Sequence, residues 1–312
     1  MYLDKFQFVL GADLETYAAN NDYFSDRDPC NIYFVLRRPK VTVDPDSINV
    51  RGKKVRFKVL IHLPEKIFEL GLHCEFKRAT SRIECHTEYP YNLMLFKDQE
   101  KPLMLARPGT LIDGNWLIGN PQSEELDYEI LYIGQAFGKN GKRTALDRLA
   151  SHQTVQKIYT HALTQFPESD IWIMLTRFAQ VGVMVAAGSA LVNVNPADKK
   201  IENKKVKHFL ENEGMLLTER QKINLTEAAL INYFEPEYNV NFKEIFPSTQ
   251  HKSYSDCYKL DVRAINIEVG THEHIRKIFT RKSGRKVHHS KLFEFGSKDE
   301  RMSFLDFKDF QY

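Results

Sequence analysis

Two side chains suited to phosphate chemistry lie close together in the segment DRLASH. Arg148 and His152 are four residues apart, so on a helix they would occupy the same face. A guanidinium neutralises the negative charge that grows on a phosphate, and an imidazole orients or deprotonates a water molecule. The pair indicates a hydrolytic site, and the competing interpretation is the edge of a solvated helix.

Glu227 is a carboxylate that the sequence places on the inward face of another helix. It follows Ile223 by four residues and precedes Leu230 by three, so it shares their apolar face. A lone buried charge is costly, and a divalent metal ion or Arg148 would provide the partner. A metal ion held by such a carboxylate assists phosphodiester hydrolysis at the leaving oxygen. A structural salt bridge is the other interpretation.

Tyr132 and Asn239 complete the set. Tyr132 begins the sequence YIG at the end of a predicted strand, and Asn239 follows a predicted helix in the sequence EPEYN. The glycine of YIG would let the strand turn tightly and let a phosphate approach the backbone. A tyrosine hydroxyl has an ordinary pKa of about 10, so it needs a nearby cation to act as a base. Lys139, Lys142, Arg148 and the metal ion are the candidates.

The elements that would position these residues alternate between strand and helix. NWLIG and YEILYIG predict two strands with a turn between them. A helix is predicted over about 142–165 from apolar residues at three- and four-residue steps, and Pro167 follows its end. DIWIMLTRF predicts another strand. A second helix is predicted over about 218–234, with Thr218 and Gln221 as a capping box and Pro236 after its end.

Three zones divide the chain of 312 residues. Residues 1–105 form a β-rich domain with short apolar or β-branched runs: Ile32–Leu36, Val41–Val43, Val55–Ile61, Leu72–Phe76 and Arg82–Cys85. Residues 106–248 are mixed α/β with an insertion at about 179–215, and residues 249–312 are a basic C-terminal extension. The predicted fold class is α+β: a small central β-sheet flanked by helices, with a β-rich N-terminal domain and a short β-containing basic C-terminal segment.

The order of the candidate segments resembles that of the GIY-YIG nuclease superfamily. LYIGQ, RLASH, EAALINYF and PEYN follow one another as the family's motifs do, over about residues 114–240. The resemblance implies that Tyr132 is the tyrosine of the YIG motif, that Arg148 faces the phosphate and that His152 is the helix histidine. It also implies that Glu227 is the metal ligand and Asn239 the closing asparagine.

The chain departs from the family pattern at the first motif, which ends in a tyrosine that is often proposed as the general base. The nearest match is the segment GNW, where Trp116 stands in place of the tyrosine, and an indole only donates hydrogen bonds. Tyr132 or His152 would then activate water, or the first tyrosine lies elsewhere. Tyr128 takes its place if the strand pairing shifts. A second departure is the longer connection between the two helices, which corresponds to the insertion.

Net charge alone does not indicate nucleic acid binding, because the formal net charge of the chain is only +3. Any basic surface must therefore be local, and basic residues do concentrate between Arg276 and Lys291. A solvated face is the competing interpretation of such charge runs. The predicted nucleic-acid contacts are Lys139, Lys142, Arg143, Arg281, Lys282, Arg285 and Lys286.

The scattered cysteines contain no CxxC pair, which favours reduced thiols over a zinc site or a disulfide framework. The N-terminus lacks a basic start and a sustained apolar core, so no signal peptide is predicted. The most apolar run, Val181–Val194, is shorter than the roughly 20 residues that a membrane span needs. A cytoplasmic protein without a membrane partner is expected.

The implied function is that of a divalent-metal-dependent endonuclease that hydrolyses phosphodiester bonds in DNA. Mg²⁺ or Mn²⁺ would be the cofactor, and RNA is the other candidate substrate. By fold-level analogy, a restriction or anti-phage defence nuclease would combine such a module with a recognition domain. The competing hypothesis, which Trp116 favours, is a nucleic-acid-binding or complex-scaffold protein with an inactive nuclease fold. A second copy of the chain or the subunits of a defence complex are the candidate protein partners.

Overall fold

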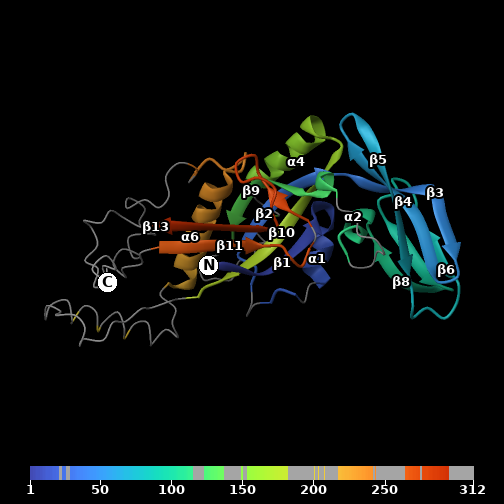
Figure 1. Cartoon of the computed structure of the whole chain (residues 1–312), viewed down its shortest axis with the longest axis horizontal. Helices are drawn as coiled ribbons and strands as arrows, with labels where there is room; N and C mark the ends of the chain where they lie inside the picture. The colour runs from blue at the N-terminus through green and yellow to red at the C-terminus, as the bar shows by residue number, and fades with distance from the viewer. Residues whose placement is uncertain are drawn as a thin grey trace, which may run out of the picture.

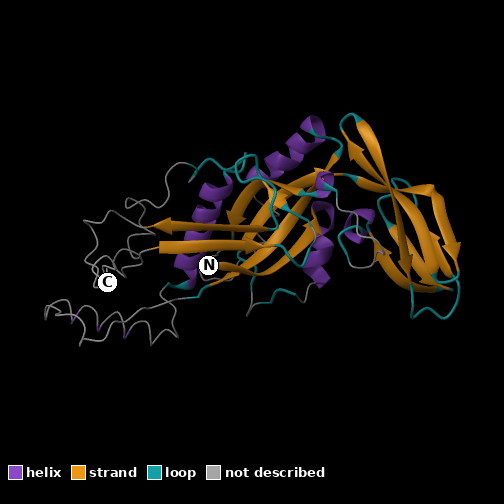
Figure 2. Cartoon of the chain, viewed as in Figure 1, coloured by secondary structure: helices purple, strands orange, loops and turns teal. Residues whose placement is uncertain are grey.

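β-strands dominate the computed structural model, which describes residues 1–20, 23–25, 29–114, 123–136, 149, 153–181, 200, 203, 207, 217–241, 243, 264–274 and 276–294. They form one seven-stranded sheet and two three-stranded sheets (Figures 1 and 2). Within these ranges the α-helices are α1 (Leu14–Asn20), α2 (Pro108–Leu111), α4 (Gln153–Gln165) and α6 (Glu219–Phe234). Short 3₁₀-helices occupy Gly11–Asp13 and Glu124–Leu126.

The seven-stranded sheet draws its strands from the whole length of the chain. They are β1 (Tyr2–Leu10), β2 (Ile32–Pro39), β9 (Tyr128–Gln135), β10 (Ser169–Ala179), β11 (Ala264–Gly270), β12 (Ile278–Phe279) and β13 (His288–Glu294). Their order is β12-β9-β2-β10-β1-β11-β13, and the sheet curls into a half-barrel. β12 runs parallel to β9 and β1 parallel to β11, while the other neighbours are antiparallel.

The prediction of an α+β fold with a small, helix-flanked central sheet is therefore wrong. The structure is mostly β, and its main sheet is large and mixed. β1 and β2 come from the predicted N-terminal zone, and β11, β12 and β13 come from the predicted C-terminal zone. The physical reason is pairing, because local periodicity identifies a strand but not the distant strand to which it hydrogen-bonds.

Strand β2 lies inside this sheet and is buried on both faces. Its residues from Ile32 to Leu36 are at most 2% exposed, which explains the uninterrupted apolar sequence IYFVL. Successive side chains of a strand point to opposite faces, so the strand contributes to two separate cores. Helix α6 packs in the core that contains Phe34, and helix α4 packs in the core that contains Tyr33.

Helix α6 begins and ends where the sequence predicts. The side chain of Thr218 accepts a hydrogen bond from the backbone of Gln221, and the backbone of Thr218 donates one to the Gln221 side chain, so the predicted capping box is confirmed. After Phe234 the chain leaves the helix through Glu235, whose φ of 47° is left-handed. The Thr280 hydroxyl donates to the carbonyl of Phe234 and fixes this end of the helix beside β12.

Residues 40–127 leave the large sheet between β2 and β9, and we call them the inserted lobe (right side of Figure 1). They contain two antiparallel sheets: β3 (Val41–Arg51), β4 (Lys54–Leu63) and β5 (Lys66–Glu75) in one, and β6 (Ile83–His86), β7 (Met94–Asp98) and β8 (Lys101–Ala106) in the other. The two sheets share one core, in which Val59, Ile61, Met94 and Phe96 are fully buried. This lobe therefore has a hydrophobic core of its own.

A charged network joins the inserted lobe to the large sheet. Asp113 accepts hydrogen bonds from Arg38 at 2.6 Å, from Arg276 at 2.8 Å and from the Tyr128 hydroxyl at 2.9 Å. The Arg38 guanidinium also lies 4.5 Å from the ring centroid of Tyr128 and 4.3 Å from that of Trp172. Both arginines are at most 2% exposed, so the shared carboxylate offsets the cost of burying their charges.

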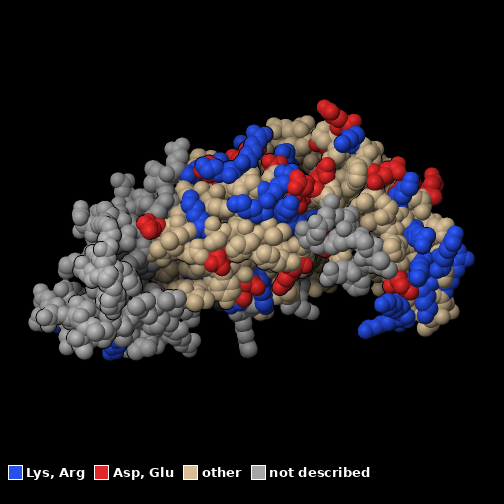
Figure 3. Space-filling model, in the orientation of Figure 1, with Lys and Arg blue, Asp and Glu red and all other residues tan. Residues whose placement is uncertain are grey.

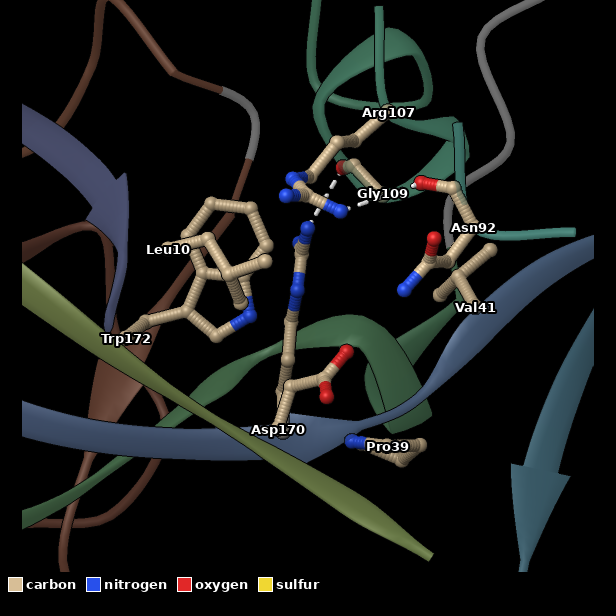
Figure 4. A pocket seen from close by; sticks show the side chains of 9 residues that line it. Leu10, Pro39, Val41, Asn92, Arg107, Gly109, Asp170 and Trp172 are labelled. Carbon is tan, nitrogen blue, oxygen red and sulfur yellow. Dashed lines mark hydrogen bonds between the residues drawn. The ribbon is translucent and has the colours of Figure 1, made fainter. Parts of the chain in front are cut away.

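A small pocket opens beside this network, with Trp172 and Asn92 on opposite sides (Figure 4). Within the described residues, the Asp170 carboxylate in this pocket makes no hydrogen bond and no ion pair. Burial raises its pKa, and the nearby cations Lys40, Arg38 and Arg107 oppose that effect without cancelling it. The complete lining is Leu10, Arg38, Pro39, Val41, Asn92, Arg107, Gly109, Asp170 and Trp172.

The described cysteines carry free thiols, as the sequence predicts. Burial raises the pKa of Cys30 and of Cys85 to about 12 and that of Cys74 to about 11, so these thiols stay protonated near neutral pH. Cys257 lies outside the described residues. None of the helices in the described ranges is long and apolar enough to cross a membrane.

Candidate active site

Tyr132 on β9 lies beside a second tyrosine, Tyr33, which comes from β2. The two strands are antiparallel neighbours, with Val35 opposite Tyr132 and Tyr33 opposite Gly134. The ring centroids of the two tyrosines are 6.2 Å apart, and the ring planes are inclined at 42°. Tyr33 is fully buried and Tyr132 is half-buried. Two phenol side chains that are far apart in the sequence therefore share one site.

Gly134 makes room for this pair. A Cβ atom at this position would lie 2.6 Å from the Tyr33 hydroxyl oxygen and 2.8 Å from Cε1 of Tyr132. Such contacts are far inside van der Waals distance, so any side chain at position 134 would displace a tyrosine. The glycine of the YIG sequence is thus required by the neighbouring strand, and not only by a turn or by an approaching phosphate.

Tyr33 is a tyrosine on a strand that neighbours β9, whereas the local sequence before β9 offers only Trp116. The neighbours of β9 in the sheet are β2 and β12, and the predicted strand NWLIG lies outside the described residues. Tyr128, the alternative, points into the core of helix α6, and its hydroxyl donates to Asp113. Sequence reasoning missed Tyr33, and its one signal was an Ile-Tyr pair that opens an apolar run after the turn segment DPCN.

Asn239 holds the strand that carries Tyr132. Its side-chain oxygen accepts a hydrogen bond from the Ile133 nitrogen at 2.9 Å, and its side-chain nitrogen donates to the Ile133 oxygen at 2.8 Å. The backbone of Tyr238 donates to the carbonyl of Leu131 at 3.0 Å. The segment EPEYN therefore lines the backbone of β9, and the amide of Asn239, at 7% exposure, acts as a two-sided clamp on it.

Tyr238 connects this clamp to helix α4. Its hydroxyl lies 3.0 Å from Nδ1 of His161, at hydrogen-bonding distance. Burial raises the pKa of Tyr238, so the hydroxyl stays protonated near neutral pH and is available as a donor. His161 was not among the predicted site residues, because nothing in the local sequence links it to a residue 77 positions away.

Glu227 lies on helix α6, one turn after the residue that ties this helix to β9. The Gln135 side chain at the end of β9 donates a hydrogen bond to Asn224 at 3.0 Å. Glu227, predicted on the inward face of its helix, is half-buried and is followed by the fully buried Ala228. The hydrogen bond anchors this part of α6 to β9, but α6 packs on the face of the sheet opposite to that of the tyrosine pair, so the described contacts do not bring Glu227 and Tyr132 together.

Several predicted site residues lie outside the described residues: Arg148, His152, Lys139, Lys142 and Arg143. Leu149, next to Arg148 in the sequence, is described. It is helical, 2% exposed and packed in the same core as Tyr33. This agrees with the predicted helix and with the inward position that the sequence assigns to Leu149.

The predicted nucleic-acid contacts of the C-terminal zone lie on the turn between β12 and β13. Lys282 forms an ion pair with Glu235 at 3.1 Å, and Arg285 forms one with Asp127 at 3.6 Å while covering the ring of Phe279. Arg281 and Lys286 are exposed as well. Arg276, part of the same basic stretch, is buried on Asp113 and is not a surface cation.

The described residues contain no group of three or more His, Cys, Asp or Glu side chains that could hold a metal ion. A site built on one carboxylate is still compatible with Mg²⁺ or Mn²⁺. Mg²⁺ usually keeps several water ligands and is held by one or two carboxylates together with substrate phosphates. Glu227, half-buried on α6 one turn after the hydrogen bond of Asn224 with Gln135, fits such a site, whereas a closed structural metal centre would need more ligands than the described residues bring together.

Comparisons of the chain with protein-family models, with curated proteins and with solved structures gave no match.

Proposed function

We propose that the chain is a divalent-metal-dependent endonuclease that hydrolyses phosphodiester bonds in DNA. The observation that carries the proposal is the meeting of Tyr33 and Tyr132 around Gly134. This pair supports the proposal because Tyr33 would act as the first tyrosine that the GIY-YIG resemblance calls for and that the sequence around Trp116 lacks. The clamp of Asn239 on Ile133 adds support, because it gives the closing asparagine a physical task at the same strand.

In the proposed reaction a water oxygen bonds to phosphorus, one ester P–O bond breaks, and the water proton passes to the phenolate form of Tyr132, which a nearby cation such as Arg148 would favour. Tyr132 is the more exposed of the two and contacts the water, while Tyr33 lies behind it against Gly134. Arg148 neutralises the charge that grows on the phosphate, and His152 orients the water. The leaving oxygen takes a proton from solvent.

Glu227 would hold the metal ion. A carboxylate-bound Mg²⁺ or Mn²⁺ stabilises charge at the leaving oxygen. The hydrogen bond between Gln135 and Asn224 keeps the Glu227 segment of α6 at a fixed position relative to β9. The proposed role of these two amides is positioning, since neither carries a group that would accept the proton.

The burial of Tyr33 favours a second candidate function, a nucleic-acid-binding protein that does not cut. A hydroxyl at 0% exposure is sheltered from bulk water, and its ring fills a hydrophobic core. In that case Tyr33 is a core residue, and Gly134 is needed only for packing. This alternative predicts salt-sensitive binding without a product that depends on Mg²⁺.

The test is cleavage of supercoiled plasmid, single-stranded DNA and single-stranded RNA in Mg²⁺ or Mn²⁺. Tyr33→Phe removes only a hydroxyl, and Glu227→Ala removes the metal carboxylate. Each should reduce the rate by about 10² or more. Tyr233→Phe is the matched control, because it removes a hydroxyl that contacts His289 on β13 and not the tyrosine pair.

Cutting that requires Tyr33 and Glu227, and that survives Tyr233→Phe, supports the nuclease and identifies its substrate. Cutting at the wild-type rate by the Glu227→Ala variant would refute the proposed metal site. Binding without a product on any of the three substrates would establish the second candidate instead.

A further inference from the structure

Two turns meet at the far end of the inserted lobe. The first joins β3 to β4 through Gly52, whose φ of 60° suits glycine at a tight hairpin turn. The second runs from Phe76 to Ile83, between β5 and β6. The Phe76 nitrogen donates to the Lys53 carbonyl, and the Ile83 nitrogen donates to the Gly52 carbonyl, both at 2.9 Å. The two turns therefore form one continuous surface.

This surface concentrates positive charge, and Figure 3 shows blue side chains gathered at the end of the lobe where β3 ends. Its exposed cations, which we call the basic tip, are Arg51, Lys53, Lys54, Arg56, Lys77, Arg78 and Arg82. None of them forms an ion pair with a described residue. The exposed carboxylates closest in sequence are Glu75 and Glu84. Glu75 stands opposite Lys54 in the β4–β5 pair, so the basic tip has a carboxylate neighbour but keeps an excess of positive charge, whereas Lys282 and Arg285 on the β12–β13 turn form ion pairs.

Asp98 on β7 holds the second turn in place by hydrogen bonds. Its carboxylate accepts hydrogen bonds from the backbone and hydroxyl of Thr80 and from the backbone and hydroxyl of Ser81. These bonds fix the backbone between Arg78 and Arg82. A surface whose backbone is already ordered loses less conformational entropy when it binds a partner.

The surroundings of the basic tip favour one kind of partner. Among the described residues of the inserted lobe, the exposed large hydrophobic ones are Ile67, Phe68, Tyr89, Leu93, Leu103 and Leu105, and none of them belongs to either turn. Insertion into a lipid surface needs apolar side chains beside the charges, and a protein interface needs a buried apolar or aromatic centre. A regular array of phosphates needs only exposed Lys and Arg side chains.

We propose that the basic tip binds the phosphate backbone of DNA, at a place remote from the tyrosine pair. Strand β3 carries the chain away from the large sheet for eleven residues, which span about 35 Å or one helical turn of duplex. The inserted lobe thus contacts the duplex about a turn or more from the tyrosine pair. This inference extends the proposed function, but the binding itself does not require cleavage.

The experiment measures binding of the full chain to a labelled DNA duplex of about 30 base pairs in EDTA, over about 50–300 mM salt. One variant combines Lys53→Gln with Lys54→Gln, and another combines Arg78→Gln with Arg82→Gln. The matched control combines Lys58→Gln with Lys66→Gln, which removes the same charge elsewhere in the lobe. Lys58 is paired with Glu69, and Lys66 starts β5 at the opposite end of the β4–β5 hairpin.

Each tip variant should lose about tenfold or more in affinity near 100 mM salt, and its slope of log affinity against log salt should decrease by about 2. The control should change the affinity less than about threefold. An equal loss in the control, or no loss in either tip variant, would overturn the proposal. Binding of the wild type to phosphatidylserine vesicles but not to duplex would also overturn it, in favour of a membrane.

The same proteins separate this inference from the proposed nuclease. If binding depends on the basic tip but no DNA is cut in Mg²⁺, the DNA-binding role of the tip is supported and the proposed nuclease activity is refuted. If both tip variants bind and cut DNA as the wild type does, the proposed nuclease is supported and the DNA-binding role of the basic tip is refuted. All substituted side chains are exposed, so unchanged thermal unfolding is expected, and each tip variant provides a separate test if the other fails to fold.

Discussion

Tyr33 and Gly134 face each other across the β2–β9 pair so closely that a single methyl group at position 134 would lie 2.6 Å from the Tyr33 hydroxyl. One residue thereby sets the position of a side chain from another strand. The contact also links two segments that lie far apart in the sequence, the apolar run IYFVL and the motif YIG.

Gly134→Ala should destabilise the protein by about 1–3 kcal/mol, because the new methyl group overpacks the site. Urea denaturation measures this loss, and plasmid cleavage should fall with it as Tyr33 and Tyr132 shift. Gly71→Ala on β5 is the matched control, since nothing lies within 4 Å of the place that its methyl group would occupy and the change should stay within about 0.5 kcal/mol. An equal cost at both positions would show that the tyrosine contact is not the cause.

Asn239→Ala should destabilise the protein by about 2–3 kcal/mol, because it removes both hydrogen bonds to Ile133 and leaves buried backbone groups without them. The Ile133 amide should also exchange faster with deuterium than in the wild type. Asn20→Ala removes an exposed hydrogen bond to Thr16 and serves as the control, with little effect on stability. Unchanged exchange at Ile133 would contradict the clamp.

Asp113→Asn should cost about 3–5 kcal/mol, because it leaves the buried guanidinium groups of Arg38 and Arg276 without their shared negative charge. Thermal and urea unfolding both measure the loss. The comparison is Asp4→Asn, which removes the partly exposed partner of Arg177 and should cost less than about 1 kcal/mol. Similar losses for the two variants would mean that the junction network contributes no more than a surface pair.

The free energy of unfolding of Asp170→Asn minus that of the wild type should be larger at neutral pH than at acidic pH. Burial raises the pKa of Asp170 in the folded state above its ordinary value of 3.8. The wild type therefore loses stability as the pH rises through the folded pKa, since the buried group must ionise. Urea denaturation from pH 3 to pH 7 measures the difference, and a difference that is constant with pH would contradict the prediction.

Asp98→Asn should give the opposite dependence on pH. Hydrogen bonds from Ser81 and Thr80 lower the pKa of Asp98 to about 2. Its contribution to stability is therefore present above the ordinary value of 3.8 and is lost as the pH falls towards about 2. Asp98→Asn should therefore lose less stability than the wild type as the pH falls below 3.8. Urea denaturation of Asp98→Asn and Asp170→Asn over the same pH range measures both effects, and each variant is the control for the other.

Local sequence patterns predicted the elements better than their arrangement. The runs Ile32–Leu36 and Val55–Ile61 are strands, and the Thr218 capping box opens helix α6. These features depend on residues that are near neighbours in the chain. The fold class failed because pairing of β2 with β9 depends on residues about a hundred positions apart, which local periodicity does not report.

The candidate site residues also differ in whether local sequence or long-range pairing identifies them. Tyr132, Glu227 and Asn239 could be named because each stands in a short motif. Tyr33 could not, since it becomes recognisable only when β2 lies beside β9. Arg276 was assigned to a basic surface for the same reason, because its partner Asp113 comes from a distant segment.

The inserted lobe also fixes when the tyrosine pair forms during synthesis of the protein. A ribosome adds about 5–20 residues per second, so β9 follows β2 by about 5–20 seconds. During that interval β2 exposes an apolar strand without its β9 neighbour, while the lobe, which has its own core, can fold. The ion pair of Arg37 with Glu129 (2.7 Å) joins β2 to β9 beside the two ends of the lobe, and it can form only when β9 has emerged. A nascent chain that stops within the lobe therefore contains Tyr33 but neither Gly134 nor Tyr132, and the site cannot assemble before the lobe is complete.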